Sequence, residues 1–301
     1  MISLEGKRLV IFGCGYVGSA VAHAAVAAGA SVEALTRNSE KAVVLRAQSL
    51  TKVVVAELSS SDWHSQLESG ADFIVNCVSS AGGPDGYRQS YLAGMASILK
   101  WASSGKTPIG AMLYTSSTSV YPQGGGAVVD ETALADGATP NGKIIRESEM
   151  LLQAVPEAVC RRWFILRLAG VYGPERHHLL NQLRAGATTL GGSGGHHLNL
   201  VHRDDIVSAV MGCLTAADGI ESQIFNVADT APAWREDVVR WLTKRLGRAM
   251  PVFDGIAGAR RGGEPMPDRV ISSEKIQRVL GWRPQHPDYR SGFDEILATN
   301  G

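Results

Sequence analysis

Short apolar runs alternate with helical segments along the first half of the chain. The apolar runs predict strands over residues 9–12, 31–35, 52–56, 73–78, 111–114 and 164–168. Helices are predicted over residues 16–28, an Ala- and Val-rich stretch ended by Gly29, and over residues 87–102. Strands that alternate with helices predict a parallel sheet with helices on both faces. Right-handed connections bring the carboxyl ends of the strands to one edge, where ligands bind.

The second half of the chain is less regular. Apolar positions predict a helix over residues 206–214, whose first N–H groups Asp204 and Asp205 can cap. A strand is predicted over residues 224–227, and an amphipathic helix over residues 235–246. Loops are predicted over residues 191–197, which contain Gly and His, and over residues 255–267, which are rich in Gly, Pro and Arg.

A glycine-rich turn follows the first predicted strand directly. Its six residues, Gly13-Cys14-Gly15-Tyr16-Val17-Gly18, have the spacing GxGxxG and open an Ala-rich helix. In this context Gly13 permits the tight turn, Gly15 lets the backbone approach a pyrophosphate, and Gly18 lets helix and sheet pack closely. The helix N-terminus supplies N–H groups and a partial positive charge for the phosphates. The turn therefore predicts a dinucleotide site on a Rossmann-type sheet.

The end of the second predicted strand indicates which dinucleotide is bound. NAD-binding proteins usually place an acidic residue there for the ribose 2′-hydroxyl, but this chain has Thr36, followed by Arg37 and Asn38. A guanidinium can pair with a 2′-phosphate through two parallel hydrogen bonds. The rival acidic residue, Glu33, lies in the middle of the strand. These residues favour NADP over NAD.

Composition narrows the class of protein. Lys and Arg together number 29, as do Asp and Glu, so the formal net charge is zero. This balance gives no electrostatic reason to expect nucleic acid or an anionic membrane as a partner. The four cysteines have no metal-ligand spacing, so buried reduced thiols are expected. No stretch approaches the ~20 apolar residues of a membrane span, and the first apolar run is too short for a signal peptide, so we expect a cytoplasmic protein.

Six further segments, together with the glycine turn, carry a resemblance to a known family. They are Glu57-Leu58, FIVNCVSSA (73–81), YTSSTSVYP (114–122), RLAGVYGP (167–174), LVHRDDIVSAV (200–210) and LGWRPQHPDYRSGF (280–293). In this order they resemble the extended short-chain dehydrogenase/reductase superfamily, in its NAD-dependent epimerase/dehydratase group. The resemblance covers nearly the whole chain, which makes it far more specific than the glycine motif alone.

The resemblance implies a Rossmann-type doubly wound parallel sheet with a smaller C-terminal α/β substrate domain. The first domain would span residues 1–170 with a returning segment near 200–230, and residues 171–301 would form most of the second. The cofactor would cross the strand ends, with Leu58 at the adenine and with Cys77 and Val78 included in its site. The substrate, a sugar nucleotide or other small carbonyl compound, would lie between the domains. A homodimer through two helices of the first domain is also implied.

The catalytic pattern that the resemblance implies is incomplete. The family carries a Tyr and, four residues later, a Lys on one helix face; the Lys lowers the pKa of the Tyr, which moves a proton during hydride transfer. None of the seven tyrosines here is followed by Lys at that distance. Aligning the segment on Glu147 keeps the lysine as Lys143 and puts Thr139 at the tyrosine position. Aligning it on Glu149 puts Asn141 and Ile145 at the two positions instead.

Other members of the implied catalytic set can be placed. The family's Ser after the fifth strand corresponds to Ser117, with Ser116 and Thr118 beside it. Tyr91 occupies a helix position that often carries an active-site Asn. The candidates for the missing proton donor are Ser117, Lys143 and Tyr121; a structural role within the SVY segment is favoured for Tyr121.

The second half of the chain contains histidines and arginines that could also be site residues. The adjacent pairs His177-His178 and His196-His197 point in different directions and do not form natural chelates, so no metal site is predicted. Loop positions in solvent are favoured for them over positions in the substrate cleft, and His202 is assigned to the junction of the two domains. Arg167 and Arg176 either contact substrate phosphates or form ion pairs between domains.

Two functions remain in competition. The first is an NAD(P)-dependent epimerase, dehydratase or reductase that lacks the usual YxxxK. The second is a catalytically silent protein that senses NADP(H) and acts through a partner, favoured by an intact phosphate-binding turn beside a missing tyrosine. A purely structural scaffold would require the glycine turn to bind nothing.

Overall fold

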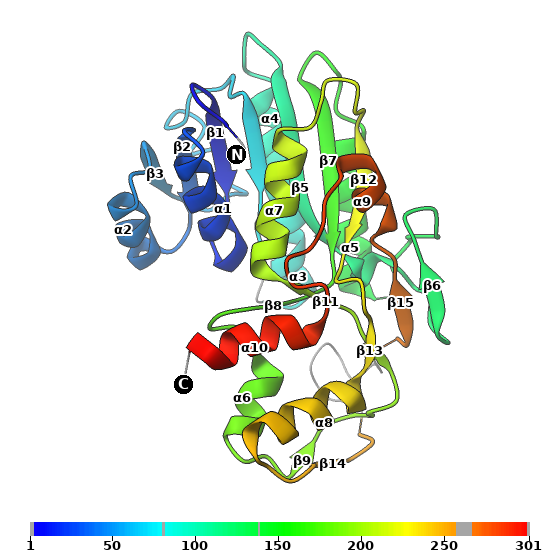
Figure 1. The fold of residues 1–301 in the computed structure, drawn as a ribbon. Coiled ribbons are helices and arrows are strands. Elements are labelled where there is room, and N and C mark those ends of the chain that lie inside the picture. The colour runs from blue at the N-terminus through cyan, green and yellow to red at the C-terminus, as the bar shows by residue number, and fades with distance from the viewer. Residues whose placement is uncertain (1–2, 80–81, 138, 257–266, 300–301) are drawn as a thin grey trace.

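A seven-stranded parallel sheet forms the centre of the molecule (Figure 1). The computed structural model describes residues 3–79, 82–137, 139–256 and 267–299. From one edge to the other, the strands are β12 (Gln223–Val227), β7 (Cys160–Leu168), β5 (Ile109–Ser117), β4 (Phe73–Asn76), β1 (Arg8–Phe12), β2 (Ser31–Thr36) and β3 (Lys52–Val55). Strands β1, β2 and β3 follow one another toward one edge of the sheet, whereas β4, β5, β7 and β12 follow one another toward the other edge. This reversal of the strand order beside β1 confirms the predicted Rossmann-type doubly wound sheet.

Two strands are longer than their apolar runs predict. The fifth continues past Tyr114 to Ser117, because the buried hydroxyls of Thr115 and Ser116 find partners in Asn76 O at 3.3 Å and Glu149 Oε1 at 2.6 Å. The strand predicted to begin at Phe164 begins at Cys160, and its first residues lie at the amino edge of the sheet, where Arg161 is exposed to solvent. Apolar runs alone do not reveal polar strand residues, even where the polar groups of those residues form hydrogen bonds inside the protein.

Helices cover both faces of the sheet (Figure 1). On one face lie α1 (Tyr16–Ala27), α2 (Ser39–Ala47), α7 (Arg203–Leu214) and α9 (Glu274–Leu280). On the other lie α4 (Gly94–Ala102) and α5 (Pro140–Gln153). Trp63 and Trp101 are fully buried in the second core, and the indole N–H of each donates to a backbone carbonyl at 3.0 Å. The near-continuous apolar strands are therefore buried on both sides, as parallel sheets require.

The helix predicted over residues 87–102 is divided into three segments. An α-helical turn, α3 (Pro84–Tyr87), leads into a π-helical segment, η1 (Arg88–Ala93), and only then into α4. Each turn of a π-helix holds an extra residue, so η1 rotates the side chains before it relative to those of α4. Such segments are rare and occur frequently at functional sites.

The start of α7 differs from its prediction. Asp204 and Asp205 were expected to cap the helix, but the N-cap is His202, whose Nδ1 accepts from the Asp204 N–H at 3.4 Å. The Asp205 carboxylate instead accepts from the backbone N–H groups of Gln285 and His286, at 2.5 and 3.1 Å. Asp205 is 1% exposed, and it joins α7 to the segment before the last helix.

The rest of the second half forms a smaller assembly below the sheet in Figure 1. Its helices are α6 (His178–Arg184), α8 (Arg235–Leu246) and α10 (Tyr289–Thr299), which share a core of their own. Among the described residues, short strands pair in β8 (Gly170–Tyr172) with β11 (Leu200–His202), β9 (Thr189–Leu190) with β14 (Val252–Phe253), and β10 (His197–Leu198) with β13 (Ala233–Trp234). A further pair, β6 (Ala127–Val129) with β15 (Arg269–Ile271), lies beside the large sheet (Figure 1).

The chain crosses between the two assemblies more than once, because α7 and β12 return to the large sheet. The division into residues 1–170 and 171–301 stays a prediction. Most of the loop predicted over residues 255–267 lies outside the described residues. Within the described ranges, no helix has the length and apolar character needed to cross a membrane.

Candidate functional site

A cavity of about 250 Å³ opens at the carboxyl edge of the sheet, beside β1. It lies where the strand order turns back, the position at which doubly wound sheets bind ligands. The residues around it come from the turn after β1, the ends of β2 and β3, the end of β4 and the segment η1: Gly13, Cys14, Gly15, Leu35, Thr36, Arg37, Asn38, Lys41, Ala56, Glu57, Leu58, Cys77, Val78, Ser79 and Ser90.

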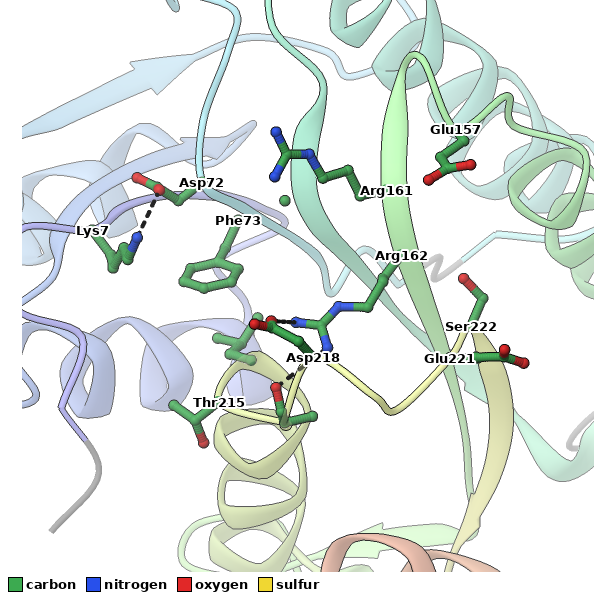
Figure 2. A pocket seen from close by; sticks show the side chains of 13 residues that line it. Lys7, Asp72, Phe73, Glu157, Arg161, Arg162, Thr215, Asp218, Glu221 and Ser222 are labelled. Carbon is green, nitrogen blue, oxygen red and sulfur yellow. Dashed lines mark hydrogen bonds and ion pairs between the residues drawn. The ribbon is translucent and has the colours of Figure 1, made fainter.

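A larger hollow of about 800 Å³ lies at the opposite, amino edge of the sheet (Figure 2). Its charged groups are largely engaged with each other or with the backbone: Lys7 pairs with Asp72 at 3.2 Å, and Arg162 donates to the carbonyl of Ala217 at 2.8 Å. Arg162 also lies 4.0 Å from Asp218. The contacts of Arg162 join the start of β7 to the segment after α7. These charged residues therefore have a role in holding the fold together.

The glycine turn has the geometry that a pyrophosphate requires. Gly13 has a φ of +87°, and a Cβ there would lie 2.7 Å from the backbone of Val78. A Cβ on Gly18 would lie 2.3 Å from the carbonyl oxygen of Gly13, so helix and turn are in direct contact. A Cβ on Gly15 would meet nothing within 4 Å. Gly13 and Gly18 therefore serve packing, whereas Gly15 faces open space that a ligand could fill.

The N-terminus of α1 is open toward this space. Gly15 is its N-cap, and no side chain caps the helix. The first N–H groups of a helix have no intrahelical partner and attract anions. The two cysteines beside the turn, Cys14 and Cys77, are free and buried, and burial raises the pKa of the Cys77 thiol to about 12. All four cysteines of the chain are buried free thiols, as predicted.

Two cations follow the end of β2. Arg37 is exposed and lines the cavity just before α2, and Lys41 lines it from the first turn of that helix. Asn38 caps α2, since its Oδ1 accepts from the Lys41 N–H at 2.7 Å. Glu33 is held by Arg8 through hydrogen bonds of 3.0 and 2.9 Å, so its carboxylate is engaged away from the cavity.

Eight of the eleven predicted cofactor residues line this cavity: Gly13, Cys14, Gly15, Arg37, Asn38, Leu58, Cys77 and Val78. The other three, Tyr16, Val17 and Gly18, form the first turn of α1. The Tyr16 hydroxyl donates to the carbonyl of Pro174 at 2.7 Å, and its ring lies 5.4 Å from the guanidinium of Arg176. Their backbone N–H groups remain at the helix N-terminus, while the Tyr16 side chain joins the turn to the second half of the chain.

Sequence reasoning missed the polar lining residues Lys41, Ser79 and Ser90 and the apolar ones Leu35 and Ala56. Lys41 carried a usable signal, because it is a second cation only four residues after Arg37. Ser90 carried none, because only the packing of η1 against the sheet brings it to the cavity.

The serines after Tyr114 have different roles. Ser116 is buried and donates to Glu149, whereas Ser117 is partly exposed at the end of β5. The Ser117 Oγ accepts from the Ser119 N–H at 3.2 Å and caps the short helix η2 (Thr118–Val120). A hydroxyl in this position keeps its own proton available for a ligand. Ser117 is therefore the serine that a substrate could reach.

The packing of α5 distinguishes the two proposed alignments. Glu149 is fully buried and accepts two hydrogen bonds from Arg167, at 3.0 and 2.7 Å, while Glu147 is exposed and lies 3.6 Å from Arg88. The fold therefore uses Glu149 as its inward glutamate. This favours the alignment that puts Asn141 at the tyrosine position, and Ile145, which is buried, at the lysine position. Arg167 is an internal ion-pair partner, not a surface group.

The other two predicted proton donors, Lys143 and Tyr121, lie in different surroundings. Lys143 is exposed on the first turn of α5, on the side away from the buried Ile145. The Tyr121 hydroxyl is buried, donates to Asn226 Oδ1 at 2.7 Å and accepts from Arg167 at 2.9 Å. This geometry supports the structural role favoured for Tyr121, whereas the role of Lys143 stays a prediction.

Arg269 of β15 supports the loop that follows Ser117, and sequence reasoning missed it. Its guanidinium is buried; Nη2 donates to the carbonyl of Thr118 at 2.8 Å and Nη1 to the carbonyl of Tyr121. A segment from the end of the chain thus fixes the backbone beside Ser117. No local pattern around Arg269 signals this long-range contact.

The paired histidines are mostly built into the fold. His177 is buried and lies 3.0 Å from the carbonyl of Gly173 through Nδ1, and His197 lies 2.7 Å from Asp268 with its ring over Trp234. His196 is also buried, so the expectation of solvated loop positions is wrong for these three; His178 is exposed as expected.

A different set of side chains, His202, Asp205 and His286, has ligand atoms within 4.8 Å of one another. His286 Nδ1 lies 3.2 Å from Asp205 and Nε2 lies 2.7 Å from Glu295. The hydrogen bond to Asp205, with that to Glu295, raises the pKa of His286 to about 9. His286 thus joins Asp205 of α7 to Glu295 of α10, and these contacts form an ion-pair clamp between the two helices.

Comparisons with known proteins agree with this architecture. A model of the NAD dependent epimerase/dehydratase family matches residues 9–228. Protein YeeZ of Escherichia coli is 27% identical over 287 residues, which cover 94% of this chain and 97% of YeeZ. UDP-glucose 4-epimerase of Lacticaseibacillus casei is 24% identical over 325 residues, covering 96% of this chain and 94% of that protein.

Solved structures extend the comparison. A putative NAD-dependent epimerase/dehydratase from Methylobacillus flagellatus has a TM-score of 0.74 at 25% identity, with 98% of each chain covered. The UDP-glucuronic acid 4-epimerase from Bacillus cereus, in complex with UDP-glucuronic acid and NAD, has a TM-score of 0.81 at 19% identity, covering 97% of this chain and 99% of that one. Since the family model matches more than two thirds of the sequence, this chain belongs to the NAD dependent epimerase/dehydratase family.

Proposed function

We propose that this protein is an NAD(P)-dependent oxidoreductase of the epimerase or dehydratase type that acts on a sugar nucleotide. The observation that carries the proposal is the glycine turn: two glycines are required by contacts inside the protein, and the third, Gly15, faces the open cavity at the helix N-terminus. Gly15 is not required by any contact inside the protein, and its open side lies at the cavity, where a pyrophosphate could approach the backbone.

NADP is the cofactor that the end of β2 favours. Arg37 and Lys41 both line the cavity, and Glu33 of β2 is engaged with Arg8. The carboxylate that lines the cavity, Glu57, follows the neighbouring strand β3. Two cations four residues apart suit a 2′-phosphate, which carries up to two negative charges. The related Bacillus cereus epimerase was solved with NAD. Arg37 and Lys41 are therefore the residues that we expect to determine whether NADP or NAD binds more tightly.

A sugar nucleotide is the substrate class that the relatives suggest. UDP-glucose and UDP-glucuronic acid epimerases share the fold over nearly its whole length. Arg176 is the remaining candidate to bind the substrate phosphates, because the guanidinium of Arg167 is buried in an ion pair with Glu149. Arg176 is exposed and lies over the ring of Tyr16, beside the N-terminus of α1.

The chemistry of the site divides between cofactor and protein. The nicotinamide, when bound, accepts and returns a hydride. Ser117 donates a hydrogen bond to the reacting oxygen of the substrate and orients it at the end of β5. The first turn of α1 holds the pyrophosphate through backbone N–H groups, and Leu58 packs against the adenine.

Calorimetric titration of the purified protein with NADPH and NADH tests the proposal. We expect NADPH to bind more tightly than NADH. Arg37→Ala and Lys41→Ala should each weaken NADPH by roughly tenfold, for a loss of about 1.4 kcal/mol, and leave NADH nearly unchanged. Lys52→Ala, a basic residue on the neighbouring strand outside the cavity, is the matched control. Absence of binding by either nucleotide would refute the proposal.

A catalytically silent sensor of NADP(H) is the second candidate, and one observation favours it. Both alignments of α5 lack a tyrosine, and Lys143 faces solvent. A sensor would bind the nucleotide with the same selectivity but would turn over none of a panel of UDP-sugars. Turnover that Ser117→Ala abolishes would exclude this alternative.

A further inference from the structure

The segment η1 brings a hydroxyl to the wall of the cofactor cavity. Ser90 lines this cavity together with the turn after β1 and the residues that follow β2, β3 and β4. The side chain is partly buried, and its Oγ has no hydrogen-bond partner among the described residues. A serine in a helix often bonds back to the carbonyl of the preceding turn, as Ser103 does with Leu99 at 2.8 Å. The Ser90 hydroxyl is therefore available to a ligand.

The residues before Ser90 on η1 are engaged outside the cavity. Arg88 lies 3.6 Å from Glu147 of α5, and the Gln89 amide donates to the Ser59 hydroxyl at 3.3 Å. These contacts hold η1 between α5 and the segment that follows β3. Among the described residues of η1, Ser90 is the one that lines the cavity.

The end of η1 packs directly on Leu58. At the Gly94 cap, the backbone hydrogen bond reaches the carbonyl of Gln89, five residues earlier, which is the spacing that defines a π-helix. A Cβ on Gly94 would lie 2.9 Å from Cδ2 of Leu58. Residues four apart lie on the same side of a helix, so Ser90 shares the side of η1 that Gly94 turns toward Leu58. Ser90 and Leu58 both line the cavity, as this geometry requires.

The wall around Leu58 suits the base of a nucleotide. Under the proposed function, the turn after β1 binds the pyrophosphate, and Arg37 and Lys41 bind the 2′-phosphate. Leu58 is 6% exposed and offers an apolar surface to the flat face of a base. The edge of an adenine carries ring nitrogens that accept hydrogen bonds, and a serine hydroxyl can donate one. An apolar contact and a hydroxyl donor thus stand side by side where the base would lie.

We propose that Ser90 binds the adenine of the cofactor and that its hydroxyl donates a hydrogen bond to a ring nitrogen of the base. The proposal rests on the proposed function, because it requires a dinucleotide in the cavity. It also gives the π-helical segment a role, since η1 presents Ser90 to the base while Arg88 and Gln89 hold the segment in place.

Two variants of the same shape test the role of the hydroxyl. Ser90→Thr keeps it, and Ser90→Val replaces it with a methyl group. Calorimetry with NADPH should show that Ser90→Val binds about 2- to 12-fold more weakly than Ser90→Thr, the range for one neutral hydrogen bond. The adenosine half alone, 2′,5′-ADP, should lose the same factor. Ser103→Ala, whose hydroxyl bonds within α4 and does not line the cavity, is the control and should bind like the native protein.

NMR identifies the group on the cofactor that accepts the hydrogen bond. A ring nitrogen changes its ¹⁵N chemical shift when it accepts a hydrogen bond. With NADP⁺ labelled with ¹⁵N in the adenine, one ring nitrogen should differ in chemical shift between the Ser90→Thr and Ser90→Val complexes. The same nitrogen should not differ between the native and Ser103→Ala complexes.

The outcomes separate this proposal from the proposed function. Equal affinities of Ser90→Thr and Ser90→Val for NADPH, or a loss for NADPH that 2′,5′-ADP does not share, overturn the role of Ser90 and leave the proposed function intact. A loss of affinity without a change at any ring nitrogen overturns the assignment to the adenine. Absence of binding of both NADPH and NADH by the native protein overturns both proposals. Matching urea unfolding curves of the two Ser90 variants exclude a folding defect as the cause of a difference.

Discussion

The carboxylate of Glu149 and the guanidinium of Arg167 form two hydrogen bonds, of 2.7 and 3.0 Å, inside the protein. Glu149 is on α5 and Arg167 on β7, and the exposed fraction of neither exceeds 2%. The pair fixes which face of α5 lies against the sheet. It therefore decides that Glu149 and Ile145 face the core, while Glu147 and Lys143 are exposed.

Removing one member of this pair should destabilise the fold strongly. Glu149→Gln leaves the Arg167 guanidinium buried without its counter-ion, and breaking a buried pair costs about 3–5 kcal/mol of unfolding free energy. Urea unfolding measures the loss. Glu147→Gln, two residues away in the exposed pair with Arg88, should change stability by no more than about 1 kcal/mol. Equal effects of the two changes would contradict the inward position of Glu149.

Two glycines of the turn should separate folding from binding. Gly15→Ala adds a methyl group into open space, so unfolding should be nearly unchanged while NADPH affinity falls at least tenfold. Gly18→Ala places its Cβ 2.3 Å from the Gly13 carbonyl, and such overpacking costs about 1–3 kcal/mol. Thermal unfolding and calorimetry on the same preparations measure both quantities. A loss of stability in Gly15→Ala as large as that in Gly18→Ala would show that the space beside Gly15 is filled by the protein.

Ser117 and Lys143 should differ sharply in their effect on turnover. Ser117→Ala removes a hydrogen bond to the reacting oxygen, which is worth about 1.5–3 kcal/mol when the oxygen carries charge, or roughly 10- to 150-fold in kcat. Lys143→Ala should leave both kcat and cofactor affinity within about twofold, because the side chain is exposed on α5. Steady-state rates with an active UDP-sugar check both. A large fall in Lys143→Ala would restore the alignment on Glu147.

His286 should make stability depend on pH in the alkaline range. It contacts Asp205 of α7 and Glu295 of α10, its ring lies 3.8 Å from that of His202, and its pKa is raised from 6.5 to about 9. Because the folded pKa is the higher one, the stabilisation is fully present below pH 6.5 and is lost as the pH rises through about 9. Urea unfolding between pH 6 and pH 10 should follow this slope.

His286→Gln provides the control for that measurement. The difference in unfolding free energy between the native protein and this variant should shrink as the pH rises from 6.5 to 9. Glu295→Gln removes one of the two carboxylates and should give an intermediate slope. A difference that does not vary with pH would contradict the ion-pair clamp between α7 and α10.

Local patterns determined much of the fold. The apolar runs located all seven strands of the sheet, because strand formation and burial follow the same alternation of apolar and polar segments. The spacing of Gly13, Gly15 and Gly18 located the turn, because backbone conformation and close approach depend on the residue itself. Arg37 was identified from its position after the second predicted strand, and Ser117 from the resemblance of its segment to the family.

Contacts distant in sequence decided the rest of the site. Glu147 and Glu149 look alike in the sequence, but two residues on a helix point roughly 200° apart, and only the packing of α5 on β7 selects the inward one. The same packing exposed Lys143 and buried Ile145. Lys41 of α2 and Ser90 of η1 line the cavity, and Arg269 of β15 supports the loop after Ser117, because tertiary packing brings these elements there. The sequence by itself therefore determined at which edge of the sheet the cofactor site lies. The tertiary structure decided which side chains reach that edge, because the direction of a side chain depends on which face of its helix or strand packs against the sheet.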